Sequence, residues 1–301
     1  MPTGPAQPHR LPGKANFLGK YRISAAEFDD SGLRWIDLQT IFADYSRWCA
    51  QLAPEAECLA AILRQCPEVH AAKSRAKKPE SLIEKIIRKS VEKRAPWASP
   101  SNYVKVVPDL IGVRALHLIQ AEWPAVNKFI RRTWPVKQRP KPVAYIQKPI
   151  PTRIRSTFAE GGCTVKIGED GYQSVHYEMA RQVGTHDIRV EVQARTLYQE
   201  AWGEISHVTA YPHRKDVVLL VKSMRKLAEV TIKADHFTSV IAGLSQLSDA
   251  IAARQRPSPQ VVDAYVELLA FLLAHYPEVG AELAQASSIP SLERLAASLF
   301  G

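Results

Sequence analysis

The arrangement of apolar and polar residues along the chain predicts a mixture of helices and strands. Apolar residues recur every three or four positions over residues 33–51, again after Pro54, and again from Pro79, a residue well tolerated at the start of a helix. A mostly apolar run over residues 111–118 predicts a strand that is covered on both faces. Helical spacing returns in four later segments, which are residues 122–133, 217–246, 261–275 and 292–300.

Residues 171–211 show the clearest pattern, which predicts a strand, a turn, a second strand and a helix. Successive side chains of a strand point to opposite faces, so one face of the second strand is apolar, with Ile188, Val190, Val192 and Ala194. The opposite face is polar and carries Arg189, Glu191, Gln193 and Arg195, and the first strand presents Tyr172, Ser174 and His176 on one side. The helix has an apolar stripe of Leu197, Ala201, Ile205 and Val208 and a polar stripe of Glu200, Glu204 and His207. The polar face of the hairpin is too rich in functional groups to be simple packing.

The remaining segments set the expected domain organisation. Residues 1–22 are expected to be a flexible N-terminal tail, because they are rich in Pro and Gly and lack apolar periodicity. Residues 134–162 are Pro-rich and basic, which predicts a loop containing one extended segment. The main domain is then expected over residues 23–240, followed by a helical C-terminal extension over residues 241–301.

The chain is basic, and its charge is unevenly distributed. It has 301 residues, 46% hydrophobic and 23% charged, with a formal net charge of +10, which is a globular composition. Residues 71–105 hold ten Lys/Arg and three Glu, a net of +7, and residues 128–155 hold nine Lys/Arg and no acid, a net of +9. Residues 241–301 hold three Arg and six acids, a net of −3. An anionic ligand is therefore expected at the middle of the chain, and net charge does not distinguish a nucleotide, an RNA or a phospholipid.

Several classes of site are excluded by what the sequence lacks. The four cysteines have no CxxC spacing and no His at metal-site spacing, so they are interpreted as reduced packing residues. No signal peptide and no apolar run long enough to span a bilayer are found, so a cytoplasmic location without a membrane partner is expected. Neither a GxxxxGKS/T loop nor a GxGxxG motif is present, so side chains would have to bind any phosphate.

Cationic side chains near the helix that starts at Pro79 are the candidates for phosphate binding. They are Arg75, Lys77, Lys85 and Arg88, and Ser81 lies one helical turn before Lys85. These side chains reach one site if the helix and the extended segment before it share a surface. The alternative is a solvated basic helix face that binds no ligand.

Two carboxylates are the candidates for a metal site. Asp109 comes just before the strand over residues 111–118, and Glu191 lies within a strand on the polar face. Two carboxylates among cations suit Mg²⁺, which takes one or two carboxylates together with substrate phosphates. The alternative is that each carboxylate forms an ion pair with an Arg, as Asp109 could with Arg114.

Three ring side chains are candidates for contacts with a nucleotide. Tyr172 on the polar face could stack on a base. His176 and His207 could donate hydrogen bonds to a phosphate. The alternatives are a Tyr of the hydrophobic core and two structural His residues.

Five short motifs occur in a fixed order, which is more specific than any one of them. They are residues 75–85 (RxKxxxSxxxK), 109–114 (DLIGVR), 171–176 (GYQSVH), 191–196 (EVQART) and 202–207 (WGEISH). With these motifs the chain resembles the RelA/SpoT synthetase domain over roughly residues 35–214. The resemblance implies an α+β fold in which a mixed β-sheet is flanked by helices, similar to nucleotidyltransferases, with a helical C-terminal extension.

The resemblance implies a pyrophosphokinase. Members of this family transfer the β,γ-pyrophosphate of ATP to the ribose 3′-hydroxyl of GDP or GTP, which makes the alarmone (p)ppGpp. The residues implied to bind ATP are Arg75, Lys77, Ser81, Lys85, Arg88 and Arg114. Those implied to bind the acceptor are Tyr172, His176, Gln193, Arg195 and His207. Asp109 and Glu191 are implied to be the catalytic pair and the Mg²⁺ ligands, and Glu191 to help deprotonate the acceptor hydroxyl.

Two alternatives to an alarmone synthetase stay open. Glu169 and Asp170 precede Gly171 where many alarmone synthetases carry Lys or Asn, and Ser206 stands where the pattern often has an acid. Some small relatives are toxins that pyrophosphorylate the 3′ CCA end of tRNA, and the basic residues 128–155 could hold an RNA backbone. The other alternative, a catalytically silent nucleotide-binding regulator, is disfavoured because both carboxylates are present.

The resemblance also bears on partners. The His-Asp hydrolase of the long family members is not expected, because the one His-Asp pair is His186–Asp187 between the core strands, so a small stand-alone member is expected. ATP, GDP or GTP, and Mg²⁺ are the implied substrates and cofactor. The sequence leaves open tRNA, an antitoxin or inhibitor protein, and a second copy of the chain as further partners.

Overall fold

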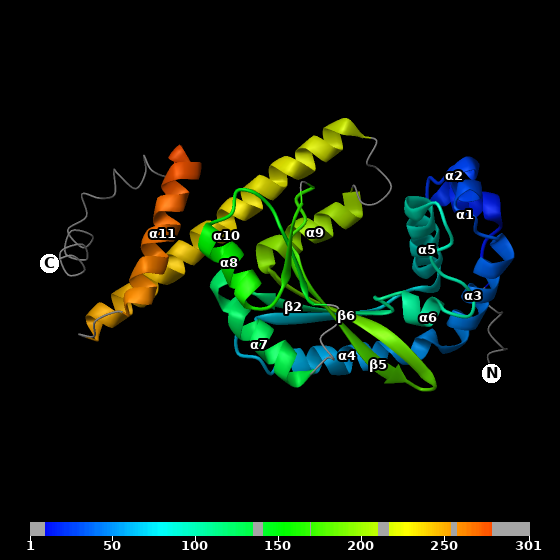
Figure 1. Cartoon of the computed structure of the whole chain (residues 1–301), viewed down its shortest axis with the longest axis horizontal. Coiled ribbons are helices and arrows are strands. Elements are labelled where there is room, and N and C mark those ends of the chain that lie inside the picture. The colour runs from blue at the N-terminus through cyan, green and yellow to red at the C-terminus, as the bar shows by residue number, and fades with distance from the viewer. Residues whose placement is uncertain (1–9, 135–140, 169, 210–216, 254–257, 279–301) are drawn as a thin grey trace, which may run out of the picture.

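The computed structural model describes residues 10–134, 141–168, 170–209, 217–253 and 258–278, and at its centre lies a mixed β-sheet (Figure 1). Its six strands are β1 (Ala71–Ala76), β2 (Ile111–His117), β3 (Val143–Ile146), β4 (Thr164–Ile167), β5 (Ser174–Val183) and β6 (His186–Thr196), in the spatial order β1-β2-β6-β5-β3-β4. β2 is parallel to β6 and β3 to β4, while the other neighbours are antiparallel. The mixed sheet flanked by helices confirms the α+β fold that was predicted.

Helices lie on both faces of this sheet. In chain order they are α1 (Lys14–Lys20), α2 (Ala25–Asp30), α3 (Trp35–Trp48), α4 (Leu52–Leu63), α5 (Pro79–Lys93), α6 (Tyr103–Val106), α7 (Trp123–Thr133), α8 (Thr152–Glu160), α9 (Leu197–Thr209), α10 (Val218–Ala252) and α11 (Pro259–His275). Two 3₁₀ turns, η1 (Cys49–Gln51) and η2 (Gln120–Glu122), precede α4 and α7. α4 packs on β1 and β2 from one side, and α9 lies on the other side with α10 packed against it (Figure 1).

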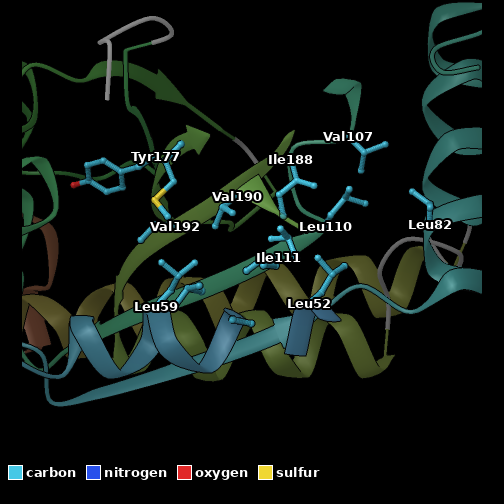
Figure 2. Packing of buried hydrophobic residues seen from close by; sticks show 14 of the residues in the cluster. Leu52, Leu59, Leu82, Val107, Leu110, Ile111, Tyr177, Ile188, Val190 and Val192 are labelled. Carbon is cyan, nitrogen blue, oxygen red and sulfur yellow. The ribbon is translucent and has the colours of Figure 1, made fainter. Parts of the chain in front are cut away.

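The apolar face of the β5–β6 hairpin forms the core. Ile188, Val190 and Val192 point toward Leu52 and Leu59 of α4, and all five side chains are almost completely buried (Figure 2). Burying a side chain of this size stabilises the fold by roughly 1.5–3 kcal/mol. The strand alternation predicted for this stretch is therefore confirmed, and the polar face is left for the site.

Residues 14–20 form helix α1, so the prediction of a flexible tail over residues 1–22 is wrong in this part. Phe17 is fully buried, and its ring centroid lies 5.7 Å from that of Trp35 in α3. Burial of Phe17 and Leu18 stabilises a helix too short to form by itself. Residues 1–9 of the predicted tail lie outside the described residues.

The segment predicted as a loop over residues 134–162 contains β3 and α8. β3 pairs with β4 on one side and with β5 on the other. α8 buries Phe158, whose ring centroid lies 4.7 Å from that of Trp123. Elements of four and nine residues are too short for periodicity to reveal. Residues 135–140 lie outside the described part.

Helix α10 continues past residue 240, where the sequence predicted the boundary of the C-terminal extension. α11 confirms the helix predicted over residues 261–275 and packs against α10, while the predicted helix over residues 292–300 is not among the described residues. No helix in the described ranges is long and apolar enough to cross a membrane. Cys58 is exposed, so its interpretation as a packing residue is wrong.

Candidate active site

Asp109 lies at the centre of a group of cations, which we call the cation cluster: Arg75, Lys77 and Lys85. Its carboxylate oxygens are 2.9 Å from Lys77 Nζ and 2.9 Å from Lys85 Nζ, and 3.7 Å from Arg75 Nη2. The antiparallel pairing of β1 with β2 places Arg75 opposite Gly112, and α5 follows β1 directly. The predicted shared surface of the helix and the extended segment is thereby present.

The protonation states of this cluster favour an anionic ligand. Burial opposes ionisation of Asp109, yet the charges of Lys77 and Lys85 outweigh it and hold the pKa of this carboxyl at about 2. Burial lowers the pKa of Lys77, and the Asp109 charge works against that effect. Three cations share one carboxylate, so the cluster has an excess of positive charge that a phosphate could balance.

Glu191 is the second ionised carboxylate of the polar face. Its Oε1 lies 3.2 Å from His176 Nδ1, and its Oε2 accepts a hydrogen bond of 2.5 Å from Gln193 Nε2. Burial opposes its ionisation, but His176 holds the pKa of Glu191 at about 2. The negative charge of Asp109 raises the pKa of Glu191, and the positive charge of Lys85 lowers it. In the parallel pairing of β2 with β6, Glu191 lies opposite Gly112, three residues after Asp109, so the two carboxylates lie in one region of the sheet.

A hydrogen-bonded network extends from Glu191 along the same face. We call Tyr172, His176, Gln193 and Arg195 the Tyr172 cluster. The Tyr172 hydroxyl lies 2.5 Å from His176 Nε2 and accepts a hydrogen bond of 3.1 Å from Arg195 Nη2, which also donates to Gln193 Oε1. The guanidinium carbon of Arg195 lies 5.4 Å from the centroid of the Tyr172 ring. These hydrogen bonds fix the Tyr172 ring by its hydroxyl end.

Glu200 is a central residue of the site that the sequence analysis did not assign. It is buried, and its carboxylate oxygens lie 2.9 Å from Arg114 Nη1, 3.0 Å from Lys73 Nζ and 3.3 Å from Arg195 Nη1. Arg114 also pairs with Glu204. The alternative in which Arg114 pairs with Asp109 is therefore not what the structure contains. The available signal was the polar stripe, where Glu200 and Glu204 are one helical turn apart.

Helix α9 turns Glu200 of its polar stripe toward the sheet and leaves most of its apolar stripe exposed. Ile205 is 43% exposed and Val208 is 83% exposed, whereas Glu200 is buried. This orientation places Glu200 against Arg114 of β2 and Arg195 of β6. A buried cation without an acidic partner is strongly destabilising, so the ion pairs favour this orientation. Gly203 permits the close approach, because a Cβ there would lie 2.7 Å from Arg195 Nη1.

The remaining predicted residues are placed less centrally. Ser81 is exposed on α5. Arg88 forms ion pairs with Glu84 at 3.1 Å and with Glu92 at 3.2 Å, both on its own helix. His207 is exposed near the end of α9, and partial burial together with the charges of Arg75 and Arg114 lowers the pKa of its imidazole.

Asp109 and Glu191 could hold a divalent cation together. Both are ionised at neutral pH and supply the oxygen ligands that Mg²⁺ prefers. Within the described ranges no group of three or more His, Cys, Asp or Glu is placed to hold a metal ion. The carboxylates therefore fit an ion that completes its coordination with water and ligand oxygens.

Comparisons with known proteins agree with this architecture. Residues 74–216, from β1 through α9, match the model of the region found in RelA/SpoT proteins. A GTP pyrophosphokinase family protein from Streptococcus pneumoniae has 18% sequence identity and a TM-score of 0.50, covering 69% of this chain and 97% of its own. The small alarmone synthetase 1 from Bacillus subtilis bound to its product pppGpp has 20% identity and a TM-score of 0.47, covering 67% of this chain and 98% of its own. No curated protein matches the chain.

Proposed function

This chain is a member of the RelA/SpoT family through residues 74–216, and from this premise we propose that it is an ATP-dependent pyrophosphokinase. The enzyme transfers the β,γ-pyrophosphate of ATP to the ribose 3′-hydroxyl of GDP or GTP and so makes (p)ppGpp. The single observation that carries the proposal is the cation cluster around Asp109 beside a second ionised carboxylate, Glu191. Phosphoryl transfer needs this combination of positioning and charge neutralisation more than it needs covalent catalysis.

The cation cluster is the proposed donor side. Asp109 forms ion pairs of 2.9 Å with Lys77 and with Lys85, which hold both ammonium groups at the site. Arg75 is more exposed than either lysine and is the cation best placed to meet incoming ATP phosphates. Arg114 is oriented by Glu200 and Glu204, so it acts as a fixed donor and not as a flexible one.

Mg²⁺ is the proposed cofactor, with Asp109 and Glu191 as its protein ligands. Bound there, it would neutralise charge on the transferred phosphates. His176 lowers the pKa of Glu191, and Lys77 and Lys85 lower that of Asp109, so both carboxylates are ionised at neutral pH. Removal of divalent metal with EDTA is expected to abolish transfer, and added Mg²⁺ to restore it. Binding of ATP measured by calorimetry with and without Mg²⁺ gives a readout that does not depend on turnover.

The Tyr172 cluster is the proposed acceptor side. Tyr172 offers a ring whose orientation is fixed at its hydroxyl, which suits stacking on a guanine base. Arg195 and His176 are the cationic and imidazole groups available to an acceptor phosphate or ribose. A carboxylate with a pKa of about 2 is a weak base. The main role of Glu191 is therefore to orient the 3′-hydroxyl by accepting a hydrogen bond from it, and removal of the hydroxyl proton is secondary.

The 3′ end of tRNA is the second candidate acceptor. The observation that supports it is the exposure of Lys128, Lys148, Arg153 and Arg155 in the basic residues 128–155. Exposed cations of this kind contact phosphates of an RNA backbone in a salt-dependent way. They could equally concentrate nucleotides near the site, so the exposure alone does not select the acceptor.

A transfer assay with ATP labelled on its γ-phosphate tests the proposal. GMP, GDP, GTP and deacylated tRNA are offered separately to the full chain, with Asp109→Ala as the inactive control. Label is expected on the guanine nucleotides and absent with the variant. Label on tRNA alone would contradict the proposed alarmone synthesis and support pyrophosphorylation of the 3′ end of tRNA. Transfer to no acceptor, with ATP binding intact, would support the silent regulator.

A further inference from the structure

Helix α10 begins at Val218, beyond the matched region, and contacts the loop that carries Tyr172. Gly171 has a backbone φ of +95°, which glycine adopts without strain. A Cβ at Gly171 would lie 2.6 Å from Ala228 Cβ and 2.8 Å from Trp202 Cζ2. The backbone of the loop therefore lies directly against Ala228, with no room for another carbon between them.

The contact belongs to a small buried cluster that joins three elements. Trp202 of α9 and Met224 and Ala228 of α10 form its core, and Tyr172 and Leu227 pack against it. Trp202 Nε1 donates a hydrogen bond of 2.9 Å to the carbonyl oxygen of Met224, which fixes α10 relative to α9. Tyr172 is thus held from two sides, by hydrogen bonds at its hydroxyl and by α10 behind its backbone.

A second attachment lies two helical turns farther along α10. Thr196 Oγ1 donates a hydrogen bond of 2.9 Å to Asp235 Oδ2, and both residues are buried. Thr196 ends β6, one residue after Arg195, and its Oγ1 also accepts a hydrogen bond of 3.2 Å from Gln199 N at the start of α9. The position of α10 is therefore coupled to the acceptor side.

We infer that α10 is a positioning element of the acceptor site, and that Ala228 is the positioning residue that sets the place of Gly171 and Tyr172. This inference rests on the proposed function, in which Tyr172 holds the acceptor base. The small size of residue 228 leaves the loop in the position that gives Tyr172 its hydrogen bonds to His176 and Arg195. A larger side chain displaces the loop and weakens acceptor binding, while the ATP site stays as it is.

A graded series at one position tests this inference in the full chain. Ala228→Ser, Ala228→Val and Ala228→Leu add increasing volume behind Gly171, and Val230→Leu enlarges an exposed side chain of the same helix as the matched control. The KM for the guanine acceptor is expected to rise with volume, by roughly tenfold for Ala228→Leu, because overpacking displaces backbone. The KM for ATP is expected to stay within about twofold, since no ATP contact changes.

Amide hydrogen exchange at residues 170–172 gives a readout that needs no turnover. Faster exchange in Ala228→Val and Ala228→Leu, with unchanged exchange in Val230→Leu, is the expected result. An unchanged acceptor KM and unchanged exchange in a folded Ala228→Leu, or an equal rise in the KM of ATP and acceptor across the series, would overturn the inference. If the unaltered chain transfers no label to any acceptor, the proposed function fails, and the exchange experiment still decides whether Ala228 holds the loop.

Discussion

The two halves of the site differ in how their charges are balanced. On the donor side, three cations surround the single carboxylate of Asp109. On the acceptor side, acids lie beside the basic groups, since Glu200 contacts Arg195 at 3.3 Å and Glu191 lies 3.2 Å from His176. An excess of positive charge suits the triphosphate of ATP, and a satisfied hydrogen-bond network suits a base and a ribose that must be oriented.

The halves also differ in where their residues come from. The donor side is built within residues 75–109 by consecutive elements, β1, α5 and the turn before β2. The acceptor side combines β5, β6, α9 and α10, and the last of these lies beyond the matched residues 74–216. The donor side should therefore depend on local charges, and the acceptor side on packing that reaches beyond the matched region.

Replacing Asp109 by Asn should produce the largest loss of transfer. The substitution removes the charge that orients Lys77 and Lys85 and one of the two proposed metal ligands. We expect kcat/KM to fall by roughly 10³-fold, measured by label transfer to GDP. Asp187→Asn, at an exposed position on β6, is the matched control and should leave transfer unchanged. A loss of less than about tenfold in Asp109→Asn would mean that the donor side is placed elsewhere.

Replacing Glu200 by Gln should affect both halves and the stability of the fold. The change leaves the buried guanidinium of Arg195 without its acidic partner. Removing one partner of a buried ion pair costs roughly 3 kcal/mol of unfolding free energy, measured by denaturant titration. The KM values of ATP and of the acceptor should both rise, because Arg114 and Arg195 lose a shared contact. Glu204→Gln is the control, since Glu204 is about half exposed and should cost far less.

Replacing Tyr172 by Ala should raise the KM of the acceptor without changing the KM of ATP, which distinguishes the acceptor side from the donor side. Stacking of a base on an aromatic ring contributes roughly 1–3 kcal/mol, so the acceptor KM should rise at least about fivefold while the ATP KM stays constant. Tyr172→Phe keeps the ring and loses the hydrogen bonds to His176 and Arg195, so a smaller rise is expected. A rise in the ATP KM, with the acceptor KM unchanged, would reverse the assignment of the two halves.

Replacing Asp235 by Asn should change how stability depends on pH. Burial raises the pKa of Asp235 from 3.8 to about 7, so the folded state binds a proton between these values that the unfolded state does not. Stability from this group is present at low pH and is lost as pH rises toward 7. Between pH 5.5 and 8 the loss amounts to roughly 2 kcal/mol by linkage, and the variant should not show it. Asp249→Asn, exposed on the same helix, should behave as the unaltered chain does.

The sequence predicted the hairpin and the shared surface that carries Arg75, Lys77 and Lys85, because these signals are local. Spacing over one helical turn and alternation along one strand are sufficient to place Lys85 and Glu191. The orientation of α9 could not be predicted, because its apolar stripe would ordinarily face a core, and the buried cations that attract Glu200 lie on β2 and β6. The contact of Ala228 with Gly171 spans more than fifty positions and leaves no local pattern in either segment.

The most direct test of the central claim compares the unaltered chain with Glu191→Gln in label transfer from γ-labelled ATP to GDP. The substitution keeps the size of the side chain and removes the charge at the proposed meeting point of the two halves. The account predicts a labelled guanine product from the unaltered chain, formed at least about 10²-fold more slowly by the variant at saturating substrates. Equal rates for the two proteins would contradict the account, because the polar face of the sheet would then not be where transfer occurs.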